Sequence, residues 1–420
     1  MVDDEYIEEQ LTIGKTEIRY LNIFWIGLIL YSVGAIFSAT EALNIKLCQA
    51  VQALGVVAMI PFAILLCRKK IDSAYLRPMF LLYMVWLIFV IFRGKSTSLS
   101  YGFIKDFLFG FNNNGLIYLA PLILLFPRKF YYYKKLFQII SIATLVYLSL
   151  CVIFIKKLAI RGDDVMGQTI IESLFDLAIP PAFILLTYRY HSNKKNLLAI
   201  VAIAITLLFS VIRARRGLIF ITSCMSFYSV LFYFFQTRKK FVMIYFGILF
   251  IVGAVVYSST LYNIQSNKLI GFLYERGNED TRSQVEVLFY DDMKMNDWIV
   301  GRGIDGEYFA PDIEKEQVTN FRTVIETGYL QIILKGGLIS LGLLLLITVP
   351  AIINGIFFSA NILSKAAAIW ILQFLINLYP QNSVSFNLGY LIVWISVGIC
   401  YSKEIRNLPD NLIKKMLYAL

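Results

Sequence analysis

Arginines carry the clearest chemical signal in this chain. Three of them stand within four residues in the segment IRARRG, as Arg213, Arg215 and Arg216. The planar guanidinium group forms two parallel hydrogen bonds with phosphate oxygens, so a group of this kind suits an anionic, phosphate-bearing ligand. A single terminal arginine usually reaches toward lipid headgroups instead, but three in one turn favour a binding role. If one helix continued through the turn, Arg213 and Arg216 would share a face and Arg215 would point elsewhere.

A charged, glycine-punctuated segment, residues 260–326, contains three further arginines of interest: Arg276, Arg282 and Arg322. A connection this long without strong secondary structure is usually functional or disordered, and its aromatic and aliphatic side chains argue against disorder. Ion pairs with neighbouring acids, worth little at a surface, are the simpler explanation for Arg276 and Arg282. Arg322 precedes Glu326 by four residues. An early helix start would place both on one face, as an ion pair or as a catalytic couple.

Three carboxylates are candidates for a general base. Glu326 stands where a long apolar segment begins, so it either caps the helix through the macrodipole or serves as a base beside a bound substrate. Glu172 and Asp176 are four residues apart within another apolar segment. Acids inside a membrane span are costly and are usually functional or paired. These two are therefore alternative bases or partners of the arginines.

Metal and cofactor chemistry has no support in the sequence. The only histidine, His191, lies in a basic loop, and no cysteine–histidine cluster or acidic metal loop is present. The five cysteines lie in or beside apolar segments, which predicts no structural disulfide. Gly301 and Gly303 predict a tight turn rather than a nucleotide site. Gly336 and Gly337 predict a kink or a close helix contact.

The composition predicts the elements that must position these groups. The chain is 58% hydrophobic and 16% charged, with a mean hydropathy of +0.69, whereas soluble proteins are typically about 45–50% apolar and about 25% charged. The sequence therefore predicts an all-α polytopic membrane protein in contact with a lipid bilayer. A spanning helix needs roughly 20 apolar residues, and about twelve segments qualify. They are 20–39, 47–66, 76–92, 108–127, 136–155, 170–189, 197–213, 217–236, 241–259, 327–353, 361–378 and 385–402.

Basic residues predict the orientation of these helices. The termini and one set of loops hold roughly twice as many lysines and arginines as the short loops of the other set, so both termini, residues 1–19 and 403–420, are predicted to be cytoplasmic. Residues 20–259 then form spans one to nine, residues 260–326 a large external loop, and residues 327–402 the last three spans. Cytoplasmic loops, rather than nucleic-acid binding, explain the net charge of +11. The arginine turn falls outside, where few basic residues are expected, which favours an anionic ligand there.

Several motifs, in this order, resemble the O-antigen polymerase and ligase superfamily, and here its Wzy-type polysaccharide polymerases. The motifs are LLFSVIRARRGLIF across two spans, Arg282 at the start of the external loop, WIVGRGIDGEYF in its middle, and IETGYLQIILKGGLISLGLLLL entering the next span. Arg216 matches the family's arginine before a small residue at the start of a span, and Arg282 matches its loop arginine. The ligase branch typically has a histidine where this chain has Glu326, which favours a polymerase.

The resemblance implies a GT-C-like fold and a metal-independent glycosyltransferase without cofactors. Such an enzyme joins undecaprenyl-pyrophosphate-linked oligosaccharide repeats into O-antigen or capsular polysaccharide on the outer face of the bacterial plasma membrane. Arginines would hold the pyrophosphate, and Glu326 or Asp176 would accept the proton of the acceptor hydroxyl. Trp298, Tyr308 and Tyr329 are candidates for sugar contacts. A chain-length regulator is the protein partner that the resemblance implies. The alternatives are the ligase of the same superfamily and a lipid-linked glycan flippase or other transporter.

Overall fold

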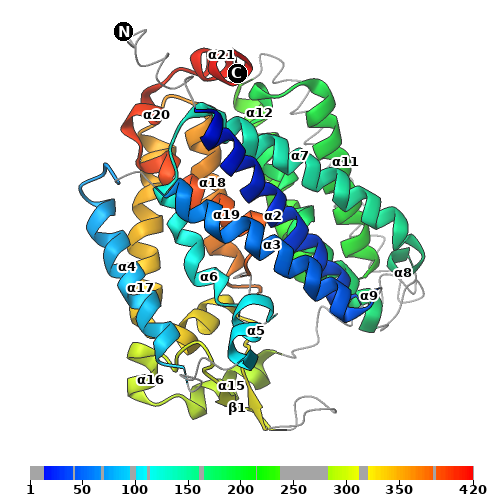
Figure 1. Cartoon of the computed structure of the whole chain (residues 1–420), viewed down its shortest axis with the longest axis vertical. Helices are drawn as coiled ribbons and strands as arrows, with labels where there is room; N and C mark the ends of the chain where they lie inside the picture. The colour runs from blue at the N-terminus through cyan, green and yellow to red at the C-terminus, as the bar shows by residue number, and fades with distance from the viewer. Residues whose placement is uncertain are drawn as a thin grey trace, which may run out of the picture.

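The chain folds into a bundle of helices with one small antiparallel pair of strands (Figure 1). The computed structural model describes residues 14–40, 43–67, 71–94, 101–110, 114–159, 165–213, 215–236, 282–311, 320–381 and 385–419. The described α-helices (α), 3₁₀-helices (η) and strands (β) are α2 (Lys15–Ala39), α3 (Ile45–Leu66), α4 (Leu76–Phe92), α5 (Tyr101–Phe109), α6 (Leu116–Leu119), η1 (Ala120–Leu125), α7 (Phe130–Ile153), α8 (Ile155–Ala159), α9 (Val165–Ala178), α10 (Pro181–Leu186), η2 (Tyr188–Tyr190), α11 (Asn193–Ile212), α12 (Arg216–Gln236), α15 (Arg282–Asp292), α16 (Met295–Val300), β1 (Tyr308–Phe309), β2 (Phe321–Arg322), α17 (Gly328–Phe357), α18 (Ile362–Asn377), α19 (Leu388–Tyr401), α20 (Lys403–Asn407) and α21 (Asp410–Ala419).

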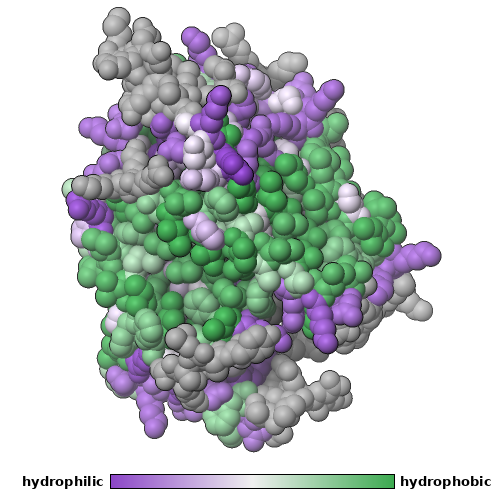
Figure 2. Space-filling view, in the orientation of Figure 1, coloured by the Kyte–Doolittle hydropathy of each residue, from purple (hydrophilic) through white to green (hydrophobic). Residues whose placement is uncertain are grey.

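The surface of the bundle has the character of a membrane protein. Within the described residues, seven helical segments are long and apolar enough to cross a bilayer. Figure 2 shows a broad hydrophobic belt around the middle, with hydrophilic residues gathered at both ends. The predicted class, an all-α polytopic membrane protein, is thus confirmed, whereas the count of about twelve spans stays a prediction. The expected span at 241–259 lies outside the described residues.

The two ends of the bundle carry different elements. At one end lie α15, α16, β1 and β2, and this end is called the loop face below (Figure 1). At the other end lie α20 and α21, and this end is called the terminal face. The arginine turn between α11 and α12 is assigned to the loop face, because Gln381 borders both Gly217 of α12 and Gly328 at the start of α17, the helix that follows β2.

Two expected spans are broken rather than continuous. The segment 108–127 is not one helix, because α5 ends at Phe109 and a new helix begins only at Leu116. Asn114 makes the restart: its Oδ1 accepts a hydrogen bond from the Leu116 N–H at 2.9 Å, and its Nδ2 donates to the Tyr31 hydroxyl at 2.5 Å. The segment 170–189 is interrupted at Pro180, between α9 and α10, because proline cannot supply the N–H that a continuous helix requires.

The predicted external loop contains a small folded core of its own. Phe289 of α15 and Tyr308 of β1 are fully buried and pack edge to face, with ring centroids 5.5 Å apart. They join Ile325 and Leu334, so this core continues into the first turns of α17. The described residues of the loop are therefore ordered by hydrophobic burial against a membrane helix, as their composition indicated.

His191 is buried at the terminal face. Its ring packs edge to face on Phe137, with centroids 4.5 Å apart, and its Nε2 lies 2.9 Å from the Thr187 hydroxyl. Burial, with a smaller contribution from nearby Lys195, lowers the pKa of His191 to about 3. The group is therefore a neutral packing element, not a base, over the physiological pH range.

This burial predicts a pH-dependent stability. In the unfolded chain the histidine protonates near its ordinary pKa of about 6.5, whereas the folded group stays neutral to about 3, so acid favours unfolding. We expect the purified protein to lose roughly 2 kcal/mol between pH 7.5 and pH 5 through this group alone. Thermal unfolding in detergent measures the effect, and His191→Gln should flatten the decline. Parallel pH curves for the two proteins would contradict the assignment.

Candidate functional site

The arginine turn is a junction between two helices. α11 ends at Ile212 and α12 begins at Arg216. One helix does not continue through the turn, so the condition under which Arg213 and Arg216 would share a face is not met. Arg213 follows the last turn of α11 and is only 3% exposed. Its guanidinium donates to the carbonyl oxygen of Lys157 and packs where Gly167 leaves room. Arg213 therefore joins α11 to α8 and α9 inside the protein.

The other two arginines of the turn face outward to different degrees. Arg215 is half-buried and forms an ion pair with Glu172 of α9, with Nη1 and Oε1 2.9 Å apart. The expectation that Glu172 is a partner of the arginines is thus confirmed for Arg215. Arg216 begins α12 with an exposed side chain. The positive end of the helix dipole adds to its charge, so this position attracts anions.

Asp176, one turn along α9 from Glu172, is held by the segment before α19. Asn387 donates from Nδ2 to Asp176 Oδ1 at 2.6 Å, and the Ser385 hydroxyl donates to the same oxygen at 3.5 Å. Asn387 also caps α19, because its Oδ1 accepts from the N–H of Tyr390 at 2.8 Å. The carboxylate is therefore half-buried and fixed in position by polar groups from a distant part of the chain.

Gln381 brings the neighbourhood of Arg216 close to that of Glu326. A Cβ atom placed on Gly217, next to Arg216, would lie 2.5 Å from Gln381 Oε1. A Cβ atom placed on Gly328, two residues after Glu326, would lie 3.0 Å from the Gln381 carbonyl oxygen. The start of α12 and the start of α17 therefore both border the same residue. Both Arg216 and Glu326 are exposed there.

Arg322 and Glu326 do not share a helix face. α17 begins only at Gly328, and Arg322 lies in β2 opposite Tyr308, so the early helix start that a shared face would require does not occur. Glu326 stands just outside the helix, and its neighbour Thr327 donates through its hydroxyl to Glu286 of α15. The segment between β2 and α17 is thus held to the loop rather than coiled into the helix.

The loop docks onto a break in α17. Gly337 adopts φ 67°, so the helix is kinked there and leaves backbone carbonyls without helical partners. The N–H of Arg302 donates to the Leu334 carbonyl at 2.7 Å, and the N–H of Gly303 donates to the Lys335 carbonyl at 2.9 Å. The loop backbone replaces the missing helical hydrogen bonds. The expected kink at Gly337 is confirmed.

Two loop glycines make this backbone approach feasible. Gly301 and Gly303 have φ values of 72° and 85°, a conformation that glycine adopts without strain. A Cβ atom on Gly301 would lie 2.5 Å from the backbone of Lys335. The expected tight turn at these glycines is confirmed. It lets Gly301 pack closely against α17 and Gly303 pack closely against the end of α4.

The Arg302 side chain, between those glycines, joins several segments of the loop. Its Nε and Nη2 donate to Asp297 Oδ2 at 3.1 and 2.9 Å, and its Nη1 also forms an ion pair with Asp292. The guanidinium further donates to the carbonyl oxygens of Asp292 and Glu307, at 2.6 and 2.7 Å. Because these acceptors engage all three of its nitrogens, Arg302 stabilises the loop fold.

A cavity of about 700 Å³, part of it open to solvent, lies beneath the docked loop. Lys335 of α17 lines it, is 6% exposed, and donates from Nζ to the Gly306 carbonyl oxygen at 2.9 Å. Other polar groups on its wall are Tyr83, Asn114, Tyr118, Gln331, Ser340 and Tyr390. Sequence reasoning missed Lys335, although a lysine inside an apolar span is itself a signal of function.

The aromatic residues of the loop divide between the core and the surface. Tyr308 is fully buried and donates to the Val324 carbonyl at 3.2 Å, so the expectation of a sugar contact by Tyr308 is wrong. Tyr329 is half-buried and donates to the Leu375 carbonyl at 2.6 Å. Trp298 stacks on Tyr290, whose ring is 48% exposed, with centroids 5.8 Å apart and planes 9° apart. This stacked pair forms an aromatic surface on the loop.

Some predicted site residues lie outside the description. Arg276 falls in the segment that the structure does not describe, and of Arg282 only the backbone, which begins α15, is described. Within the described ranges, no group of three or more histidine, cysteine, aspartate or glutamate side chains gathers in a metal-binding arrangement. All five cysteines are free thiols.

Comparison with known proteins adds no identification. No family model, no curated protein and no solved structure matches this chain.

Proposed function

We propose that this protein is a polymerase of lipid-linked oligosaccharide repeats, acting at the loop face. Its donor would be a glycan carried on undecaprenyl pyrophosphate, and its product an O-antigen or capsular polysaccharide. The loop face would be the outer side of a bacterial plasma membrane, with both termini in the cytoplasm. No metal or nucleotide sugar is needed for this chemistry.

One observation carries the proposal. Exposed Arg216 directly precedes Gly217 in α12, and exposed Glu326 stands two residues before Gly328 of α17. Both glycines border Gln381, at the end of the bundle where a folded loop is docked. The cationic helix start suits the anionic pyrophosphate of such a substrate, and the Glu326 carboxylate lies at the same end of the bundle. Arg215 and Glu172 extend the charged surface along α9.

These charges support the proposed reaction. An acceptor sugar hydroxyl attacks the anomeric carbon of the donor glycan, and the bond from that carbon to the pyrophosphate oxygen breaks. The lipid pyrophosphate leaves as an anion, which preorganised arginine charge stabilises as it forms. A carboxylate accepts the proton of the attacking hydroxyl. The stacked pair of Trp298 and Tyr290 provides a face on which a sugar ring can pack.

Of the three carboxylates, Asp176 has the geometry of a positioned base. Glu172 is paired with Arg215, and Glu326 is exposed and lies before the first residue of α17. Asp176 is held by Asn387 and Ser385, so its orientation is fixed before a substrate arrives.

Asp176→Asn should therefore lower the rate of polymer formation by roughly 10²–10⁴, because the proton acceptor is lost while the side-chain shape is kept. The assay is the extension of lipid-linked repeats by membranes containing equal amounts of inserted protein. Glu326→Gln is the matched comparison and should cost less than roughly tenfold. The reverse order of the two effects would transfer the role of the base to Glu326.

The proposed function is tested by the glycan ladder of cells that lack this protein, with and without rescue by the wild-type chain. Loss of the ladder with retention of a core-plus-one-repeat band supports the polymerase. Loss of every repeat-bearing band, with lipid-linked polymer accumulating, identifies a ligase instead. Accumulation of unpolymerised repeats on the cytoplasmic side identifies a flippase and rejects the polymerase.

A further inference from the structure

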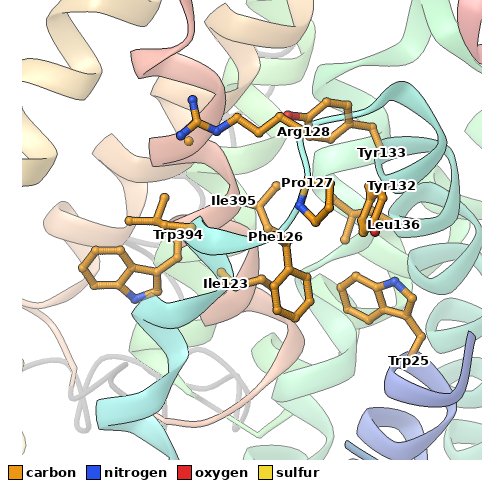
Figure 3. Close-up of a pocket in the computed structure, with 12 residues that line it drawn as sticks. Trp25, Ile123, Phe126, Pro127, Arg128, Tyr132, Tyr133, Leu136, Trp394 and Ile395 are labelled. Atoms are coloured by element: carbon orange, nitrogen blue, oxygen red, sulfur yellow. The ribbon is translucent and has the colours of Figure 1, made fainter. Parts of the chain in front are cut away.

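A second cavity lies away from the loop face, between α2, η1, the start of α7 and α19 (Figure 3). It contains about 440 Å³ of space, part of it open to solvent. In Figure 3 the rings of Trp25, Phe126 and Trp394 lie along one side, and the Arg128 side chain runs along the opposite side. Leu136 and Ile395 add to a wall that is mostly carbon.

Arg128 is buried in this wall, and two of its three guanidinium nitrogens have no hydrogen-bond acceptor among the described residues. Its side chain is 8% exposed, and its Nη1 lies 3.8 Å from Oδ2 of Asp72, whose own side chain is 58% exposed. Its Nε and Nη2 are buried and have no hydrogen-bond acceptor in the described part of the chain. Leaving a buried charged donor unsatisfied is costly, so a partner is expected at this position.

The two unsatisfied nitrogens define the shape of that partner. Nε and Nη2 form one edge of the guanidinium plane, and their N–H bonds run parallel, as a bidentate fork requires. The Nη1 edge faces Asp72, so the fork is directed elsewhere. Two acceptor oxygens on one tetrahedral or planar centre fit such an edge, and phosphate is the common group with this geometry.

The remaining lining selects for a ligand with an apolar part. Trp25 is 2% exposed, and its Nε1 is also buried without an acceptor among the described residues. Ordered water in a cavity needs two to four polar partners, and a wall this rich in carbon offers few. A group that carries oxygens at one end and hydrocarbon at the other satisfies both the Arg128 fork and the apolar wall.

We propose that this cavity is a binding site for a phosphate group on the side of the bundle opposite the loop face, with Arg128 as its bidentate ligand. Arg128 stands between η1 and α7, in the same end of the bundle as Asp72 and the start of α4. The phosphate belongs either to an anionic lipid headgroup or to a free phosphate. The site is independent of the proposed glycan chemistry, because it shares no residue with the loop-face site.

The test uses the purified full-length protein and two probes. In the first arm, the protein is placed in nanodiscs of phosphatidylcholine with increasing phosphatidylglycerol, and retained phosphatidylglycerol is counted by native mass spectrometry. In the second arm, inorganic phosphate is titrated into the protein in detergent. Arg128→Gln should weaken phosphatidylglycerol retention by roughly tenfold or more, since two charge-assisted hydrogen bonds are lost. Arg77→Gln removes the same charge from an exposed position of α4 and should change retention less than about twofold.

Each outcome decides the proposal. Selective retention that depends on Arg128 but not on Arg77 supports a lipid headgroup site. Binding of inorganic phosphate that depends on Arg128, without phosphatidylglycerol selectivity, supports the site with free phosphate as its source. Equal binding by wild type and Arg128→Gln, or equal losses in the two arginine variants, overturns it. If Arg128→Gln does not purify as a single species, Trp25→Phe is the second variant. It keeps an aromatic side chain, removes the indole N–H donor and should weaken phosphate binding by about two- to fivefold. Unchanged binding by this variant overturns the proposal.

Discussion

Replacing Arg216 with alanine should reduce the glycan made by rescued cells from a ladder to single repeats. The exposed guanidinium stands at the start of α12, where helix dipole and side-chain charge would act together on the anionic leaving group of the proposed reaction. Losing one preorganised contact of this kind typically costs about 3–4 kcal/mol of barrier, or about 10²–10³ in rate. A polymerase slowed to that extent would release most chains after one repeat. The measurement is gel analysis of surface glycan at matched levels of inserted protein.

Lys156→Ala is the control for charge alone. Lys156 is an exposed residue of α8. The carbonyl oxygen of the next residue, Lys157, accepts a hydrogen bond from the Arg213 guanidinium. Its loss removes one positive charge from the same region without touching the start of α12, so chain length should stay normal. Full-length ladders from Arg216→Ala cells would remove this arginine from the mechanism. Short glycan chains from both variants would show that chain length depends on general surface charge and not on a specific contact by Arg216.

Among substitutions that add one methyl group to α17, Gly337→Ala should cause the largest loss of protein stability. The residue has φ 67° and ψ −176°, a conformation that is essentially restricted to glycine and costs another residue about 1–3 kcal/mol. The new Cβ would also overlap the carbonyl of Ile299 in the docked loop. We expect a total cost of roughly 3 kcal/mol or more, because neither backbone can move without breaking the hydrogen bonds that join them.

Two measurements separate the local effect from the global one. Thermal unfolding in detergent reports overall stability, and limited proteolysis reports release of the loop between α15 and β1. Gly342→Ala, in the same helix, is the matched control, because a Cβ atom there meets nothing within 4 Å. That variant should be neutral or gain up to about 1 kcal/mol through helix propensity. Equal stability of the two variants would show that the kink at Gly337 does not hold the loop.

The docked loop connects the kink in α17 to the proposed site near the starts of α12 and α17. The loop backbone caps the broken α17, and the start of α17 stands beside Gln381 and thus beside α12. A loosened loop would therefore also disturb the segment that contains Glu326. Gly337→Ala should shorten glycan chains even where the protein remains inserted, whereas Gly342→Ala should not.

The amino-acid sequence by itself determined the class of the protein. Apolar segment length and charge density are local and additive quantities, so they predicted a helical membrane protein, and the seven long apolar helical segments agree with this. The sequence also predicted the tight turn and the kink in the backbone, since Gly301, Gly303 and Gly337 adopt the positive φ angles that only glycine tolerates well. The pairing of Glu172 with an arginine was also foreseeable, because an acid in an apolar span requires a partner.

Only the tertiary structure decided which polar groups are internal and which face outward. Arg213 and Arg216 look alike in the sequence, yet one is buried against Lys157 and the other is exposed, because the helix ends between them. Asp176 meets Asn387 more than two hundred residues away, and Lys335 lines a cavity that forms only when the loop docks. Hydrogen-bond partners and burial depend on which distant segments come together. That information lies in the packing of the whole chain, and no local pattern of residue types contains it.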